Sequence, residues 1–158
     1  MSDSISSLFQ ADRVFLGVEA KDSSELFQKL ESMLQAKGLV KPTWHQAIEA
    51  REQDFPTGLH FKTCNIAIPH VDPEHIEHEY VAVIKPVEPV LFEPMGKMGD
   101  PVHASLVINL GIMQGGGQVK MLQALMKVFM DEASAADILS QDSAEGIVEA
   151  FERHMQMS

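Results

Sequence analysis

The chain has 158 residues, of which 45% are hydrophobic and 22% are charged, and its net charge is −11. These values predict one globular domain and exclude a disordered chain, a collagen and a coiled coil. No apolar run approaches the roughly 20 residues that cross a bilayer, and an acidic charge without a basic stripe disfavours binding to nucleic acid. Residues 1–7 lack the pattern of a signal peptide, and the single cysteine, Cys64, cannot form an internal disulfide. We therefore expect a flexible N-terminus over 1–7, no membrane insertion and a cytoplasmic location.

The first part of the chain predicts one strand and two helices. The short apolar segment 13–18 is typical of a strand. Apolar residues at helical spacing, preceded by a capping aspartate or serine, predict a helix over 22–38. A second helix is predicted over 43–54, because Thr43 begins the spacing of a capping box and Pro56 follows the helix.

The remainder of the chain predicts several short strands and three helices. Strands are predicted over 65–68, 80–85 and 102–110, and 90–92 forms a short strand within a loop rich in proline and glycine. The glycines at 115–117 precede predicted helices over 118–130, 134–139 and 143–154. Helices interleaved with about five short strands predict a single α/β domain over 8–154, with a mixed parallel and antiparallel sheet flanked by helices.

One histidine stands where a predicted strand meets a proline. The run Ile66-Ala67-Ile68-Pro69-His70 predicts an imidazole at the carboxyl edge of the sheet, where α/β proteins place ligand sites. A neutral imidazole is a nucleophile and can form a covalent intermediate. From this spacing alone, an ordinary histidine of a surface loop is the more frequent outcome.

A second group of polar residues precedes this strand. Arg51 and Glu52 lie near the end of the second predicted helix, and a turn with Thr57 and Gly58 follows. A guanidinium, a hydroxyl and main-chain N–H groups are the donors that bind a phosphoryl group. Taken alone, Arg51 is better explained as a cation that stabilises a helix C-terminus.

Together these segments resemble the IIA component of the bacterial sugar phosphotransferase system. The resemblance extends over 8–154 and rests on two blocks, Arg51-Glu52 with Pro56-Thr57-Gly58, and Ile66 to His70. It is strongest to the fructose/mannitol-type family and, within that, to the galactitol-specific proteins, which implies the type-2 IIA fold.

The resemblance also implies a reaction and its partners. Phospho-HPr would phosphorylate His70 at Nε2, and His70 would pass the phosphoryl group to a cysteine of a IIB protein. The protein would thus be a phosphotransferase component with a covalent phosphohistidine intermediate. It would serve uptake of a sugar alcohol such as galactitol through a IIC membrane permease, without a cofactor or a metal.

Four further residues receive roles from the same resemblance. Arg51 is expected to stabilise the phosphoryl oxygens, and Thr57 is expected to assist from the turn. Glu52 is expected to orient Arg51 or to hold the helix end, because a carboxylate repels phosphate. Gln118 stands where many mannitol- and fructose-type relatives carry a second histidine, and its amide can donate a neutral hydrogen bond but carries no charge.

Two alternative functions are also compatible with the sequence. A regulatory protein with the same fold, signalling through its phosphorylation state, would need the same His70 and Arg51. A metal site over 70–79, formed by three histidines and the acidic residues between them, lacks a recognised ligand spacing. Cys64 is expected to be buried or half-buried.

An apolar surface around His70 is expected to contact the partner proteins, because docking must bring the donor phosphorus close to an imidazole nitrogen. Phe55, Leu59, Val71 and exposed methionines are the candidates for this contact.

Overall fold

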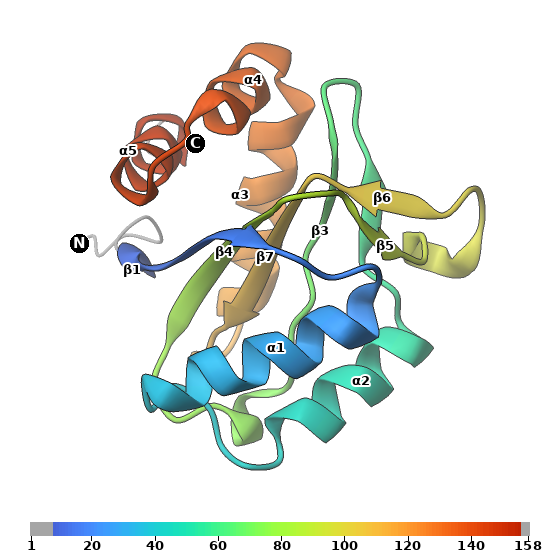
Figure 1. Cartoon of the computed structure of the whole chain (residues 1–158), viewed down its shortest axis with the longest axis vertical. Helices are drawn as coiled ribbons and strands as arrows, with labels where there is room; N and C mark the ends of the chain where they lie inside the picture. The colour runs from blue at the N-terminus through green and yellow to red at the C-terminus, as the bar shows by residue number, and fades with distance from the viewer. Residues whose placement is uncertain (1–7, 156–158) are drawn as a thin grey trace.

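A mixed sheet of five strands forms the centre of the protein (Figure 1). The structure is a computed structural model and describes residues 8–155. The strands lie in the order β1 (Phe9–Val18), β4 (Tyr80–Pro86), β7 (Leu106–Gly111), β3 (Asn65–Ala67) and β2 (Gly58–His60). β1 is parallel to β4 and β3 is parallel to β7, whereas β4–β7 and β2–β3 are antiparallel. The predicted mixed sheet of about five strands is therefore confirmed. The expected flexible segment 1–7 lies outside the described residues.

Helices cover both faces of this sheet (Figure 1). One face carries α1 (Ser23–Ala36) and α2 (Trp44–Asp54), and the other carries α3 (Gly117–Met130), α4 (Glu132–Ser140) and α5 (Ala144–Met155). Because strand residues point alternately to the two faces, Ile66 packs into the core beneath α3 to α5, whereas Ala67 packs into the core beneath α1 and α2. Within residues 8–155, no helix is long and apolar enough to cross a membrane.

A second sheet consists of only two strands, β5 (Val90–Phe92) and β6 (Val102–Ala104). The single strand predicted over 102–110 is wrong, because the chain leaves β6 at Ser105 and then enters β7 in the central sheet. β6 alternates between buried and exposed residues, whereas every residue of β7 is buried. β2 was not predicted, since three residues are too few for an alternating pattern to show.

The starts of α1 and α2 are capped in different ways. Asp22 caps α1 as predicted, and its Oδ1 accepts the N–H of Glu25 at 3.0 Å. The capping box predicted at Thr43 is wrong, because Thr43 has helical backbone angles and its side chain makes no capping bond. Its Oγ1 lies 2.8 Å from Nδ1 of His75 instead. This contact joins the start of α2 to the short 3₁₀ turn η2 (Pro73–His75).

Candidate functional site

His70 lies at the edge of the central sheet where two parallel strands end. β3 ends at Ala67, and after Pro69 the chain meets β7 again, with His70 bridged to Leu110 in the parallel sense. The N–H of Leu110 donates to the carbonyl oxygen of Pro69 at 3.1 Å. The structure thus places His70 at the carboxyl edge that the sequence indicated.

The imidazole of His70 is held in one orientation and one tautomer. It is 7% exposed, and its Nδ1 lies 2.9 Å from the carbonyl oxygen of Ile68. Since a carbonyl oxygen only accepts, Nδ1 carries the hydrogen and Nε2 keeps its lone pair. Burial lowers the pKa of His70 below 6.5, and Arg51 acts in the same direction, while the hydrogen bond to Ile68 and the charge of Asp72 oppose this shift. His70 is therefore neutral at pH 7, with Nε2 ready to act as a nucleophile.

A buried polar pair supports the residue before His70. Asn109 Nδ2 donates to the carbonyl oxygen of Pro69 at 3.0 Å, and the hydroxyl of Tyr80 donates to Asn109 Oδ1 at 2.6 Å. Burial raises the pKa of Tyr80 far above 10, so the hydroxyl keeps its proton and remains a donor. This pair was not predicted from the sequence. The signal was present in an asparagine within the otherwise apolar strand β7.

Arg51 lies in the last turn of α2, beside a small hollow of about 260 Å³. One of its terminal nitrogens, Nη1, is 3.6 Å from Asp72 Oδ1, and the guanidinium carbon lies 5.5 Å from the centre of the Phe55 ring. Its buried Nε has no hydrogen-bond partner among the residues that the structure describes. The guanidinium thus has one long ion pair, and its buried Nε–H has no hydrogen-bond partner in the described part of the chain.

Glu52 and Thr57 are bound to each other. Glu52 accepts the N–H of Thr57 at 2.7 Å and the Thr57 hydroxyl at 3.0 Å. Burial raises the pKa of Glu52 to about 7, against the effect of these hydrogen bonds and of Arg51. The carbonyl oxygen of Thr57 accepts the N–H of Ile68, and the carbonyl oxygen of Ile68 accepts the Nδ1–H of His70. Glu52 therefore holds the turn after α2 and supports the His70 segment through two residues.

Gln118 reaches the same segment from the opposite face of the sheet. It lies in the first turn of α3, and its Nε2 donates to the carbonyl oxygen of Val71 at 2.7 Å. The structure therefore brings Arg51 and Gln118 to the two sides of the His70 segment. Thr57 and Glu52 lie beneath that segment in the hydrogen-bond chain described above.

Two residues of the metal alternative contact other parts of the fold. His75 contacts Thr43 as described above, and Glu79 accepts the N–H groups of Met113 and Gln114 at 2.6 and 3.0 Å. No three His, Cys, Asp or Glu side chains of residues 8–155 are placed to hold a metal ion. Cys64 is half-buried as expected, and burial raises the pKa of its thiol to about 11.

Two of the apolar candidates for partner contact differ sharply in exposure. Phe55 is 64% exposed beside Arg51, which suits a docking surface. Val71 is fully buried in the core beneath α1 and α2, so its expected role at a docking surface is wrong. The strand alternation that continues past Pro69 points this side chain inwards.

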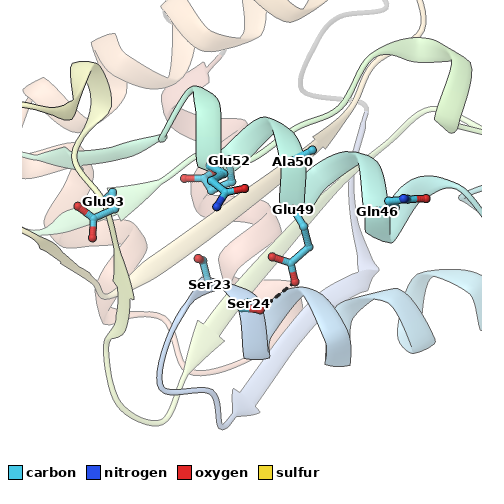
Figure 2. A pocket seen from close by; sticks show the side chains of 8 residues that line it. Ser23, Ser24, Gln46, Glu49, Ala50, Glu52 and Glu93 are labelled. Carbon is cyan, nitrogen blue, oxygen red and sulfur yellow. Dashed lines mark hydrogen bonds between the residues drawn. The ribbon is translucent and has the colours of Figure 1, made fainter.

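A larger hollow, of about 550 Å³, lies between the start of α1 and the outer side of α2 (Figure 2). Its walls carry Glu49, Glu52 and Glu93, and Ser24 donates to Glu49 at 2.9 Å. The residues that line it include no lysine or arginine in the described part of the chain. Carboxylates without a neighbouring cation repel a phosphoryl group, so the hollow at Arg51 suits that group better than this one does.

Comparisons with known proteins agree on one family. Residues 7–154 match the family model "Phosphoenolpyruvate-dependent sugar phosphotransferase system, EIIA 2". The galactitol-specific EIIA component of Escherichia coli (strain K12) is 36% identical over 109 residues, which cover 69% of this chain and 72% of that protein. The mannitol-specific phosphotransferase enzyme IIA component of Staphylococcus aureus (strain MRSA252) is 28% identical over 151 residues, or 94% and 97% of the two chains. The solved complex of enzyme IIAMTL and phosphorylated enzyme IIBMTL from Escherichia coli superposes with a TM-score of 0.72 at 23% identity, covering 91% of this chain and 96% of the other.

Proposed function

Because the chain belongs to the EIIA 2 family of the phosphoenolpyruvate-dependent sugar phosphotransferase system, we propose that it carries a phosphoryl group on Nε2 of His70. The observation that supports this most directly is the hydrogen bond from His70 Nδ1 to the carbonyl of Ile68. That bond leaves Nε2 unprotonated, and the low pKa of the buried ring keeps it so at neutral pH.

The proposed step moves one phosphoryl group between two nitrogens. The lone pair of His70 Nε2 attacks the phosphorus of the donor phosphohistidine, the new N–P bond forms, and the donor's N–P bond breaks. The proton on Nδ1 stays where it is, and the carbonyl of Ile68 stabilises the positive charge that the ring acquires. Arg51, with its unused Nε–H, neutralises the phosphoryl oxygens, which is the main requirement of a loose transition state.

The onward step reverses this sequence. A thiolate on the acceptor protein attacks phosphorus, an S–P bond forms, and the pair of electrons of the N–P bond returns to Nε2. The neutral imidazole is then restored with its Nδ1 proton in place. No cofactor and no metal enters either step.

We propose HPr as the donor and a IIB protein as the acceptor, with a IIC permease as the membrane partner of the IIB protein. The complex with phosphorylated IIB of a protein of the same fold supports the acceptor. Galactitol and mannitol relatives favour a sugar alcohol as the transported substrate. We place this exchange in the cytoplasm.

The test is phosphorylation with purified proteins. The chain is incubated with enzyme I, HPr and phosphoenolpyruvate, and acid-labile phosphate is mapped by mass spectrometry. We expect label on His70, none in His70→Gln, and undiminished label in the matched variant His75→Gln. Label that persists in His70→Gln would assign the acceptor to another residue.

A second stage separates a carrier from a regulator. Labelled protein is mixed with IIB proteins encoded beside it, and loss of label from His70 is followed with time. Rapid appearance of label on a IIB cysteine supports the carrier. Rapid charging by HPr without any onward transfer would instead support a protein that signals through its phosphorylation state.

A further inference from the structure

The side chain of Asp72 does not make the capping hydrogen bond that is usual at its position. It is the N-cap residue of η2, with Pro73 following it, yet its side chain makes no capping bond. An aspartate at this position usually accepts a main-chain N–H of the turn. The carboxylate faces Arg51 instead, with Oδ1 at 3.6 Å from Nη1.

The pair between Asp72 and Arg51 is open and easily broken. The Asp72 side chain is 64% exposed and that of Arg51 is 34% exposed, and 3.6 Å is too long for a strong hydrogen bond. Both charges also act on His70, since Arg51 lowers its pKa and Asp72 raises it. The acceptor imidazole therefore stands within the field of a cation and an anion that hold each other loosely.

We propose that Asp72 competes with the phosphoryl group for Arg51 and thereby weakens the hold of the protein on phosphorylated His70. This inference rests on the proposed function. A phosphoryl group brings a charge of about −1.5 to −2 next to Arg51. Arg51 then turns from the carboxylate to the phosphoryl oxygens, and Asp72 is left facing a second anion.

The free and phosphorylated states differ in what Asp72 contributes. In the free state its charge is partly neutralised by Arg51, whereas in the phosphorylated state it repels the phosphoryl oxygens. Asp72 therefore disfavours the phosphorylated state and increases the tendency to pass the group on. Since exposed ion pairs are weak and the phosphoryl group carries up to two charges, we expect an effect of roughly threefold to tenfold on the phosphorylation equilibrium.

The test measures that equilibrium with phosphorylated HPr for wild type, Asp72→Asn, Asp72→Glu and Asp54→Asn. Asp54 is the matched control, because it is exposed and lines the same hollow as Arg51 but forms no ion pair with Arg51. We expect Asp72→Asn to shift the equilibrium toward the phosphorylated chain by about threefold to tenfold. Asp72→Glu should stay near wild type, and Asp54→Asn should shift it less than twofold.

A second readout separates charge from mere structure. The ³¹P chemical shift of phosphorylated His70 is titrated with pH in each variant. Loss of the Asp72 charge should lower the phosphoryl pKa by about half a unit, which a loosened turn would not do. The inference would be overturned if Asp72→Asn left the equilibrium and the titration unchanged, or if Asp54→Asn changed them equally. Label on wild-type His70 would still support the proposed function in that case. Absence of label on wild-type His70 would overturn both.

Discussion

The ring of His70 and the carbonyl group of Ile68, two residues earlier in the chain, are joined by a hydrogen bond of 2.9 Å. The bond lies within a single turn of chain around Pro69, so the strand that ends at Ala67 also fixes the tautomer of the imidazole that follows it. The nitrogen that we propose as the phosphoryl acceptor is consequently selected by the backbone and not by a second side chain.

The first prediction concerns the pH dependence of phosphoryl acceptance. Because burial lowers the pKa of His70 below 6.5, the ring stays neutral on mild acidification, and protonation stops the reaction only at lower pH. We expect an NMR titration of the His70 ring to give a midpoint below 6.5, and the acceptance rate to fall only around that midpoint. A midpoint at or above 6.5 would contradict the burial argument.

The second prediction concerns Arg51→Lys. Lysine keeps the charge but lacks the planar fork and the Nε–H donor of arginine. Removal of one preorganised donor typically costs on the order of 10²-fold in rate. We expect a folded variant with slow phosphoryl acceptance in a rapid-quench assay, and an unchanged thermal unfolding midpoint serves as its control. Rates within threefold of wild type would leave Arg51 only as a cation at the end of α2.

The third prediction concerns Tyr80→Phe. Loss of the hydroxyl leaves Asn109 Oδ1 without its 2.6 Å donor in a buried site, which costs about 1–3 kcal/mol of unfolding free energy. Urea unfolding measures this loss. In a double-mutant cycle with Asn109→Leu, the double variant should lose less unfolding free energy than the sum of the two single losses, since both substitutions remove the same hydrogen bond. Full additivity would show that the two side chains act independently.

The fourth prediction concerns Glu52 and the stability of the fold. Its pKa of about 7 in the folded protein lies above 4.5, so the folded chain keeps a proton that the unfolded chain releases between these values. The free energy of unfolding therefore falls as pH rises from 4.5 to 7, by on the order of 3 kcal/mol, and this contribution is constant above pH 7.

Glu52→Gln removes this group from the titration. Urea unfolding at several pH values should give a flatter profile for Glu52→Gln than for wild type over that window. Glu93→Gln is the matched control, because Glu93 is exposed and lines the same hollow as Glu52 (Figure 2). Parallel profiles for wild type and Glu52→Gln would refute the assignment.

The fifth prediction concerns Gly111→Ala at the end of β7. A Cβ atom there would lie 2.1 Å from the ring of Tyr80, so the ring that supports Asn109 would have to move. Overpacking of this kind typically costs about 1–3 kcal/mol. Gly115→Ala is the control, since a Cβ there meets open space. Calorimetry should show a lower unfolding midpoint for Gly111→Ala and almost no change in the midpoint for Gly115→Ala.

The sequence was most informative where a structural feature is local. The strand, the proline and the histidine of 66–70 are consecutive, so their order alone indicated an imidazole at a sheet edge. Asp22 likewise predicted the start of α1, because a capping residue lies next to the helix that it caps. The division of 102–110 into β6 and β7 was not predictable, because it depends on which strands pair across the fold.

The supporting contacts of the site were hidden for the same reason. Tyr80 and Asn109 are 29 residues apart, and Gln118 bonds to a residue 47 positions earlier. Residue type nevertheless gave one usable signal, since a buried asparagine in an apolar strand needs hydrogen-bond partners. The pairing of Arg51 with Asp72 gave no comparable signal, because exposed acidic residues are common in this chain.

The two faces of the sheet each contribute one side chain to the surroundings of His70. Arg51 comes from α2 on one face, and Gln118 comes from α3 on the other. A chain in which only one helical layer had docked would lack either the guanidinium or the amide. Phosphorylation followed during refolding should therefore lag behind formation of the strand that carries His70, and should report the moment at which both layers have closed on the sheet.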